Sequence, residues 1–177
     1  MRRTKALEST AYHEAGHAVA AYRHGMKVKR LTIVPSGDAL GSHQSHAYFT
    51  GINLEYDGGA REQRRAENFA LVCFAGPAAQ RRFNPKGYRS YHGADDIHQA
   101  LGMLGYLAGD DEILAAYWKL VDLQARAFIE SAVNWRTVEH LATVLLDQRT
   151  MTGTEVRAAI QEGYRRQVPK PPKIRTY

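Results

Sequence analysis

Residues 11–23 of this 177-residue chain read Ala-Tyr-His-Glu-Ala-Gly-His-Ala-Val-Ala-Ala-Tyr-Arg. Alanine is the strongest helix former, and Ser9 or Thr10 can cap a helix that starts here. Gly25 follows at the position where helices commonly stop. The stretch therefore predicts a helix over 11–23, and its small apolar side chains suit close packing against a neighbouring element.

His13, Glu14 and His17 form the pattern His-Glu-x-x-His inside this predicted helix. Side chains four residues apart lie on one helical face, so both imidazoles can reach one metal ion. Glu14 is offset toward a metal-bound water, whose pKa zinc lowers to about 7, and is placed to act as a general base. The alternative is two surface histidines on an amphipathic helix. The small apolar neighbours argue against it, because they would bury both imidazoles and leave them needing polar partners.

A catalytic zinc takes a third protein ligand and leaves its fourth position to water. The metzincin class is excluded, because Ala20 and Arg23 stand where it requires Gly and His. Asp95 and Asp96 follow a loop and open a predicted helix, where carboxylates also serve simply as capping groups. Spacing alone does not choose among these two and the remaining donors, which are His43, His46, His92, Glu139 and His140.

The rest of the chain predicts a helix-dominated α+β domain with one small sheet. Residues 28–34 alternate as a β-strand does, and residues 45–50 are a candidate second strand. A long helix is predicted over 61–83, and Pro77 should bend or restart it because proline removes a helical hydrogen bond. Four further helices are predicted over 94–107, 111–133, 135–148 and 154–166.

Composition and charge exclude several classes of protein. The chain is 44% apolar and 24% charged, which excludes a disordered chain. No apolar run is long enough for a membrane span or a signal peptide, and the single cysteine, Cys73, excludes an internal disulfide. These features predict a cytoplasmic location.

The net charge of +6 is concentrated at the two ends of the chain. Eight of the 24 basic residues, and none of the 18 acidic ones, lie in residues 1–5 and 164–177, so the remainder has a net charge of −2. We therefore predict a basic N-terminal arm over 1–8, one domain over 9–166 and a flexible, basic, proline-rich tail over 167–177. Nucleic-acid binding is not expected of the domain and is left only to the arms.

Four segments resemble, in order along the chain, the peptidase domain of the FtsH-type ATP-dependent zinc metalloproteases. Residues 12–20 resemble the zinc helix of that family, and residues 29–41 resemble the strand that follows it. Residues 74–79 are similar to its Gly-Gly-Arg-Ala-Ala-Glu helix, and residues 93–97 to its Gly-Ala-Ser-Asn-Asp-Ile segment. The likeness covers about residues 8–163.

The resemblance implies a fold and a ligand set. The fold is a zinc-binding helix and a small sheet followed by a C-terminal helical bundle. Zn²⁺ would be held by His13, His17 and Asp96, with Glu14 as the base. Asp95 stands where the family has Asn, so exchange of the ligand role between Asp95 and Asp96 stays open.

The resemblance also implies partners. The substrate would be a polypeptide, the chains would form a homo-oligomer (a hexamer in the family), and a separate ATPase would act as partner, since only about eight residues precede the zinc helix. Residues 31–34 are expected either to pair with an extended peptide as an edge strand or to be an ordinary strand. The altered segment Gly76-Pro77-Ala78 favours an alternative function, a weak or inactive zinc-binding adaptor module.

Overall fold

The computed structural model describes residues 4–35, 42–45 and 59–167. This part of the chain forms six α-helices and a three-stranded sheet. The elements are α1 (Lys5–Arg23), β1 (Val28–Thr32), β2 (Ser42–Ser45), α2 (Ala60–Phe83), a short 3-10 helix η1 (Ser90–Gly93), α3 (Ala94–Gly105), α4 (Asp111–Glu130), α5 (Ala132–Gln148), β3 (Thr150–Thr152) and α6 (Gly153–Arg165). The predicted helix-dominated α+β class is confirmed, and the four helices after residue 93 end within three residues of their predicted bounds.

The first helix begins earlier than the sequence indicated. The Thr4 hydroxyl caps α1 by accepting a hydrogen bond from the Leu7 N–H at 3.3 Å. Ser9, expected at the cap, lies inside the helix and donates its hydroxyl to the Lys5 carbonyl at 2.8 Å. Residues 5–8 are therefore helical and belong to α1. Residues 1–3 and 168–177, which hold most of the basic ends, lie outside the described residues.

The sheet has the order β2-β1-β3, with both pairs antiparallel. Leu31 of β1 pairs with His43 on one side and with Met151 on the other. The expectation of an edge strand at 31–34 is wrong for the residues in β1, because both of their edges are already hydrogen-bonded within the sheet. The candidate strand at 45–50 appears as β2 at 42–45, and residues 46–50 lie outside the described part. Strand β3 was not predicted, because three residues are too few to show an alternating pattern.

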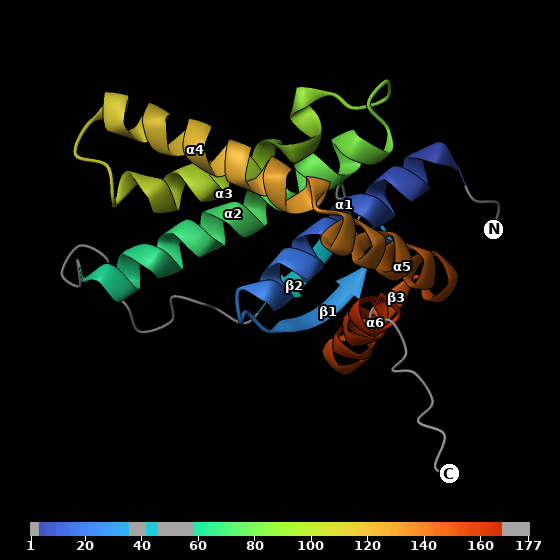
Figure 1. The fold of residues 1–177 in the computed structure, drawn as a ribbon. Helices are drawn as coiled ribbons and strands as arrows, with labels where there is room; N and C mark the ends of the chain where they lie inside the picture. The colour runs from blue at the N-terminus through green and yellow to red at the C-terminus, as the bar shows by residue number, and fades with distance from the viewer. Residues whose placement is uncertain (1–3, 36–41, 46–58, 168–177) are drawn as a thin grey trace, which may run out of the picture.

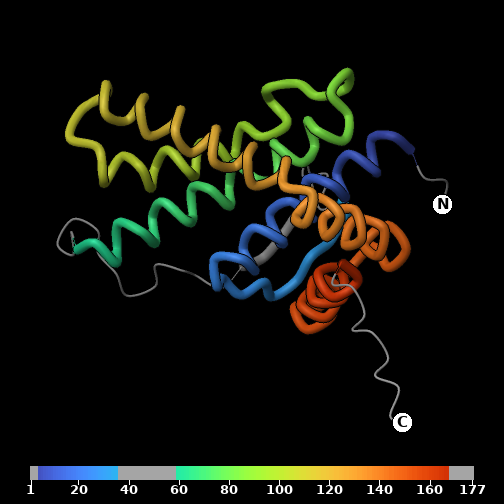
Figure 2. Tube along the Cα trace, in the orientation of Figure 1, coloured from blue at the N-terminus to red at the C-terminus, as the bar shows by residue number. Residues whose placement is uncertain are grey.

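Helix α1 lies between two groups of elements (Figure 1). On one side α2 crosses it and carries α3 and α4; on the other lie β1, α5 and α6, as the tube of Figure 2 also shows. None of the described helices combines the length and apolarity that crossing a membrane requires.

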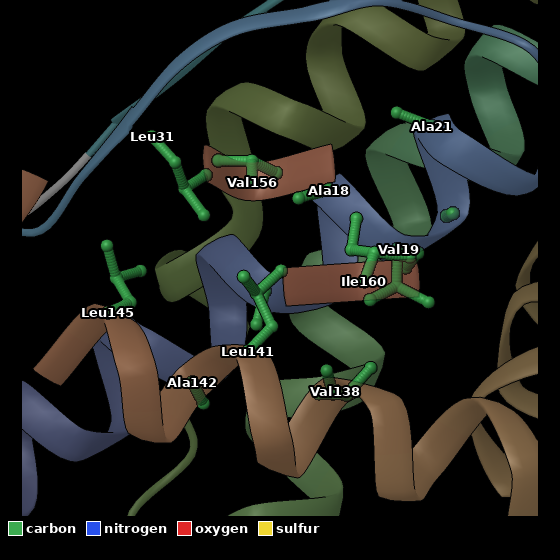
Figure 3. Packing of buried hydrophobic residues seen from close by; sticks show 14 of the residues in the cluster. Ala18, Val19, Ala21, Leu31, Val138, Leu141, Ala142, Leu145, Val156 and Ile160 are labelled. Atoms are coloured by element: carbon green, nitrogen blue, oxygen red, sulfur yellow. The ribbon is translucent and has the colours of Figure 1, made fainter. Parts of the chain in front are cut away.

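The larger of two buried apolar clusters surrounds α1 (Figure 3). Ala18 and Val19 of α1 meet Leu141 of α5 and Ile160 of α6 in this cluster. All four are completely or almost completely buried. A second cluster joins α2 to α3 and α4 and contains Cys73, whose thiol is buried. Burial raises the pKa of this thiol and keeps it protonated.

Pro77 neither ends nor restarts α2, which runs without a break from Ala60 to Phe83. The proline lies inside the helix, against Gly93, where a side chain would come within 2.4 Å of its ring. The expected restart is therefore wrong. The tertiary contact holds in place a residue that helical propensity alone disfavours.

We expect Gly16→Ala to lower the free energy of unfolding by about 1–3 kcal/mol, because it overpacks the contact between α1 and α2. A Cβ at Gly16 would lie 2.6 Å from the Ala75 carbonyl oxygen and 2.7 Å from the Ala79 Cβ. Gly102→Ala is the matched control, since nothing lies within 4 Å of its Cβ position. It should be neutral or stabilise α3 by up to about 1 kcal/mol. Equal urea midpoints for the two variants would contradict this account.

Candidate metal centre

Three side chains from two distant parts of the sequence converge beside α1. The Nε2 atoms of His13 and His17 lie 3.0 Å apart. One carboxylate oxygen of Asp96 lies 3.0 Å from the His13 Nε2, and the other lies 3.2 Å from the His17 Nε2. Asp96 comes from the first turn of α3, so the fold brings it to the two histidines across about eighty residues of sequence.

The arrangement suits a small divalent cation. Tetrahedral zinc, with bonds of about 2.0–2.1 Å, holds its ligand atoms about 3.3 Å apart, close to the 3.0 Å between the two Nε2 atoms. One ligand atom from each of the three side chains can be chosen so that all lie within 4.8 Å of one another. Two imidazoles and a carboxylate are donors that zinc prefers. Among the described residues, this is the one cluster of three or more His, Cys, Asp or Glu side chains whose ligand atoms converge in this way.

His17 is fixed by the main chain of α2. Its Nδ1 lies 2.7 Å from the Val72 carbonyl oxygen. A carbonyl only accepts, so Nδ1 carries a proton, and Nε2 is the nitrogen that faces His13 and Asp96 and that could bind a metal once it is deprotonated. The side chain is 1% exposed, and Gly76 makes room for it: a Cβ there would lie 2.2 Å from the His17 Nε2.

His13 is held by side chains instead. Its Nδ1 lies 2.9 Å from the Gln80 Oε1. The Nε2 of Gln80 lies 3.2 Å from the Nδ1 of His92 in η1. His92, which the sequence offered as a donor, is therefore separated from His13 by Gln80 and lies two residues further from the metal centre.

Asp96, and not Asp95, faces the two histidines. The Asp96 side chain is 18% exposed, whereas Asp95 is exposed on the helix surface. The start of α3 is positioned by Gly93, which is buried against Pro77. A proline at 77 fits only against a glycine at 93. Pro77, which is absent from the Gly-Gly-Arg-Ala-Ala-Glu segment of the family that this chain resembles, therefore helps to position the segment that carries Asp96.

Glu14 is buried beside the cluster, with 4% of its surface exposed. Burial raises the pKa of its carboxyl group, and the negative charge of Asp96 raises it further, while His13 and His17 act in the opposite direction. A carboxylate with a raised pKa is a stronger base, which suits proton abstraction near neutral pH.

The charges of the cluster are strongly coupled in the metal-free protein. Burial lowers the pKa of His17, but the neighbouring Asp96 more than offsets this and raises it to about 9. Burial also disfavours the Asp96 carboxylate, yet His17 and His13 hold the pKa of Asp96 well below its usual range. Asp96 is therefore an anion at every pH at which the protein would work.

Glu139 and His140, whose side chains the structure describes, are not brought to the centre. Both lie on α5, and His140 has Arg166 as its neighbour at 3.4 Å. His43 lies in β2, where only its backbone pairing is described, and His46 lies outside the described residues.

Sequence reasoning missed three groups that support the metal centre: the Val72 carbonyl, Gly76 and Gln80. The carbonyl carries no sequence signal at all. Gln80 directly follows the segment 74–79 that resembles the family, and its position one helical turn after Gly76 was the available signal.

Comparison with known proteins supports the resemblance. The model of the family described as Peptidase family M41 matches residues 1–50, which include His13, Glu14 and His17 but not Asp96. Two curated relatives are each named ATP-dependent zinc metalloprotease FtsH. The protein from Streptobacillus moniliformis is 28% identical over 180 residues, and that from Leptotrichia buccalis is 27% identical over 177 residues. Both alignments cover 85% of this chain but only 25% and 22% of the relatives. The chain is thus similar to an FtsH-type peptidase domain and spans about a quarter of the length of these relatives.

Proposed function

We propose that this chain is a zinc-dependent endopeptidase domain, in which His13, His17 and Asp96 hold the metal and Glu14 is the general base. The observation that carries the proposal is the convergence of two Nε2 atoms and a carboxylate beside a buried glutamate. The names of the two relatives support zinc as the metal and proteolysis as the reaction.

The residues divide the chemistry between them. Bound zinc supplies a Lewis acid that polarises the scissile carbonyl and acidifies the attacking water. Glu14 takes a proton from that water and later delivers it to the leaving nitrogen, which requires a base close to neutral pKa. Asp96 would add a negative charge that stabilises the cation. The Val72 carbonyl and the Gln80 Oε1, which lie against the two Nδ1 atoms, keep the imidazoles aligned.

The proposal is tested by adding zinc to chelator-treated protein and following cleavage of an unstructured, fluorogenic casein. We expect cleavage that depends on zinc and stops when a chelator is added. Zinc binding without any cleavage would reject the enzyme and leave the alternative, a zinc-binding interaction module. Cleavage that survives complete removal of metal would reject the zinc mechanism.

Substituting Asp95 and Asp96 one at a time tests which of the two is the metal ligand. We expect Asp96→Asn to weaken zinc affinity by more than about a hundredfold, because it removes the charged ligand rather than a supporting group, whose loss costs about 10–100-fold. Asp95→Asn, on the exposed side of the same turn, should leave the affinity within about twofold. Competition with a chromophoric chelator measures both, and the reverse order of effects would assign the ligand role to Asp95.

We further propose that the domain acts as a homo-oligomer on substrates that an ATPase unfolds. The relatives named ATP-dependent support this proposal. The mass of the protein in solution tests the assembly. If residues 1–177 alone degraded a stably folded substrate as fast as casein, the need for an ATPase would be rejected.

A further inference from the structure

We propose that Gln80 and His92 form a positioning relay, anchored on the main-chain N–H of Arg89, that sets the tautomer of His13. The relay turns the lone pair of the His13 Nε2 toward the metal. This inference rests on the proposed function, because it concerns the same metal centre. Gln80 and His92 touch neither metal nor substrate and act through His13.

The relay begins at the main-chain N–H of Arg89, which can only donate a hydrogen bond. The Arg89 N–H is 3.1 Å from the Nδ1 of His92. A main-chain N–H can only donate, so the His92 Nδ1 must carry a lone pair and accept. The neutral His92 ring therefore bears its proton on Nε2.

That tautomer fixes the amide of Gln80. Its Nε2 lies 3.2 Å from the same His92 Nδ1, which is already an acceptor, so the NH₂ group donates there. The carbonyl oxygen of the amide is then the atom that lies 2.9 Å from the His13 Nδ1. The opposite orientation would set an oxygen against a lone pair at His92 and is disfavoured.

The amide in turn fixes His13. The Gln80 Oε1 can only accept, so the proton of His13 is on Nδ1, and Nε2 carries the lone pair. Gln80 is buried, with 9% of its surface exposed, so water competes little for these hydrogen bonds. Without the relay, the His13 proton could lie on Nε2, where it would donate to Asp96 at 3.0 Å and block the metal.

The two histidines are thus oriented by different kinds of hydrogen-bond acceptor. His17 is fixed directly by the Val72 carbonyl, which cannot rotate. His13 is fixed through a side-chain amide, whose orientation depends on the loop residue Arg89 two hydrogen bonds away. A substitution of His92 should therefore affect metal binding through the tautomer of His13 and leave the tautomer of His17 unchanged.

The experiment compares two substitutions of His92. His92→Phe keeps an aromatic ring and removes the acceptor, whereas His92→Asn restores an acceptor oxygen near the position of Nδ1. We expect His92→Phe, like Gln80→Met, to weaken zinc affinity by about 10–100-fold, as losses of supporting groups do. His92→Asn should remain within about threefold of the wild type. Equal affinities for His92→Phe and His92→Asn would overturn the relay.

A second readout needs neither zinc nor activity. Long-range ¹H–¹⁵N spectra of the metal-free protein, recorded at mildly alkaline pH, report which nitrogen of each neutral imidazole carries the proton. We expect the Nδ1–H form of His13 in the wild type and in His92→Asn, and a shift toward Nε2–H in His92→Phe and Gln80→Met. An unchanged His13 tautomer in both of these would overturn the proposal. If the wild type binds no zinc, the proposed function fails, while these spectra still decide the relay.

Discussion

Glu14→Gln should reduce the turnover of casein by about 10²–10⁴-fold while leaving zinc bound, because the amide keeps the shape of the side chain but cannot take a proton. The zinc ligands are untouched by the change, so chelator competition should give an affinity within a few-fold of the wild type. Initial rates at saturating substrate, measured beside zinc content, distinguish loss of the base from loss of the metal.

Glu8→Gln is the matched control, because it makes the same chemical change on the same helix. Glu8 lies near the start of α1, where it is 3.8 Å from the Lys5 ammonium group in an exposed ion pair. Such pairs contribute little to stability, so this variant should keep wild-type activity. Activity retained in Glu14→Gln would rule out Glu14 as the base.

Gly76→Ala should abolish high-affinity zinc binding and lower stability together. The added methyl group would lie 2.2 Å from the Nε2 and 2.5 Å from two ring carbons of His17. The ring cannot retreat without breaking its hydrogen bond to the Val72 carbonyl, because it is completely enclosed. We expect zinc affinity to fall by more than about a hundredfold, since a ligand is displaced, and the free energy of unfolding to fall by about 1–3 kcal/mol.

Gly102→Ala is again the control, because it places alanine in a helix where its Cβ meets nothing within 4 Å. Zinc titration and urea unfolding of the two variants, both in chelator and in zinc, separate the two effects. Wild-type zinc affinity in Gly76→Ala would show that His17 can move and still bind, and that the close fit of α2 is not required.

The His-Glu-x-x-His pattern illustrates how far local sequence reaches. Helical geometry alone places His13 and His17 on one face, and the small residues around them predict that this face is buried. The third residue proposed as a ligand is different. Asp95 and Asp96 are neighbours of the same chemical type, and only the rotation of α3 on α2, set where Gly93 meets Pro77, turns one of them inward.

The sequence-based predictions that the structure corrects fail for the same reason, namely contacts that a local pattern does not show. The start of α1 was placed at Ser9 or Thr10 because both are good capping residues, but the helix continues to Thr4, whose hydroxyl satisfies the Leu7 N–H instead. Of the two alternatives for residues 31–34, the edge strand fails for the residues in β1, because β3, which is too short to be recognised from the sequence, pairs with Leu31 and closes that edge. Pro77 looked like a break because propensity ignores the contact with Gly93.

The sequence by itself predicted the helix-dominated class, the face of α1 that carries His13 and His17, and the position of Glu14 next to them, because these follow from spacing within one element. It also indicated that the positive charge belongs to the ends of the chain. The tertiary structure decided which carboxylate meets the histidines, which nitrogen of each imidazole faces it, and that Gly76 and Gln80 lie against these two rings. Those features depend on contacts between α1, α2 and α3 at distances of a few ångströms, and no local pattern encodes such contacts.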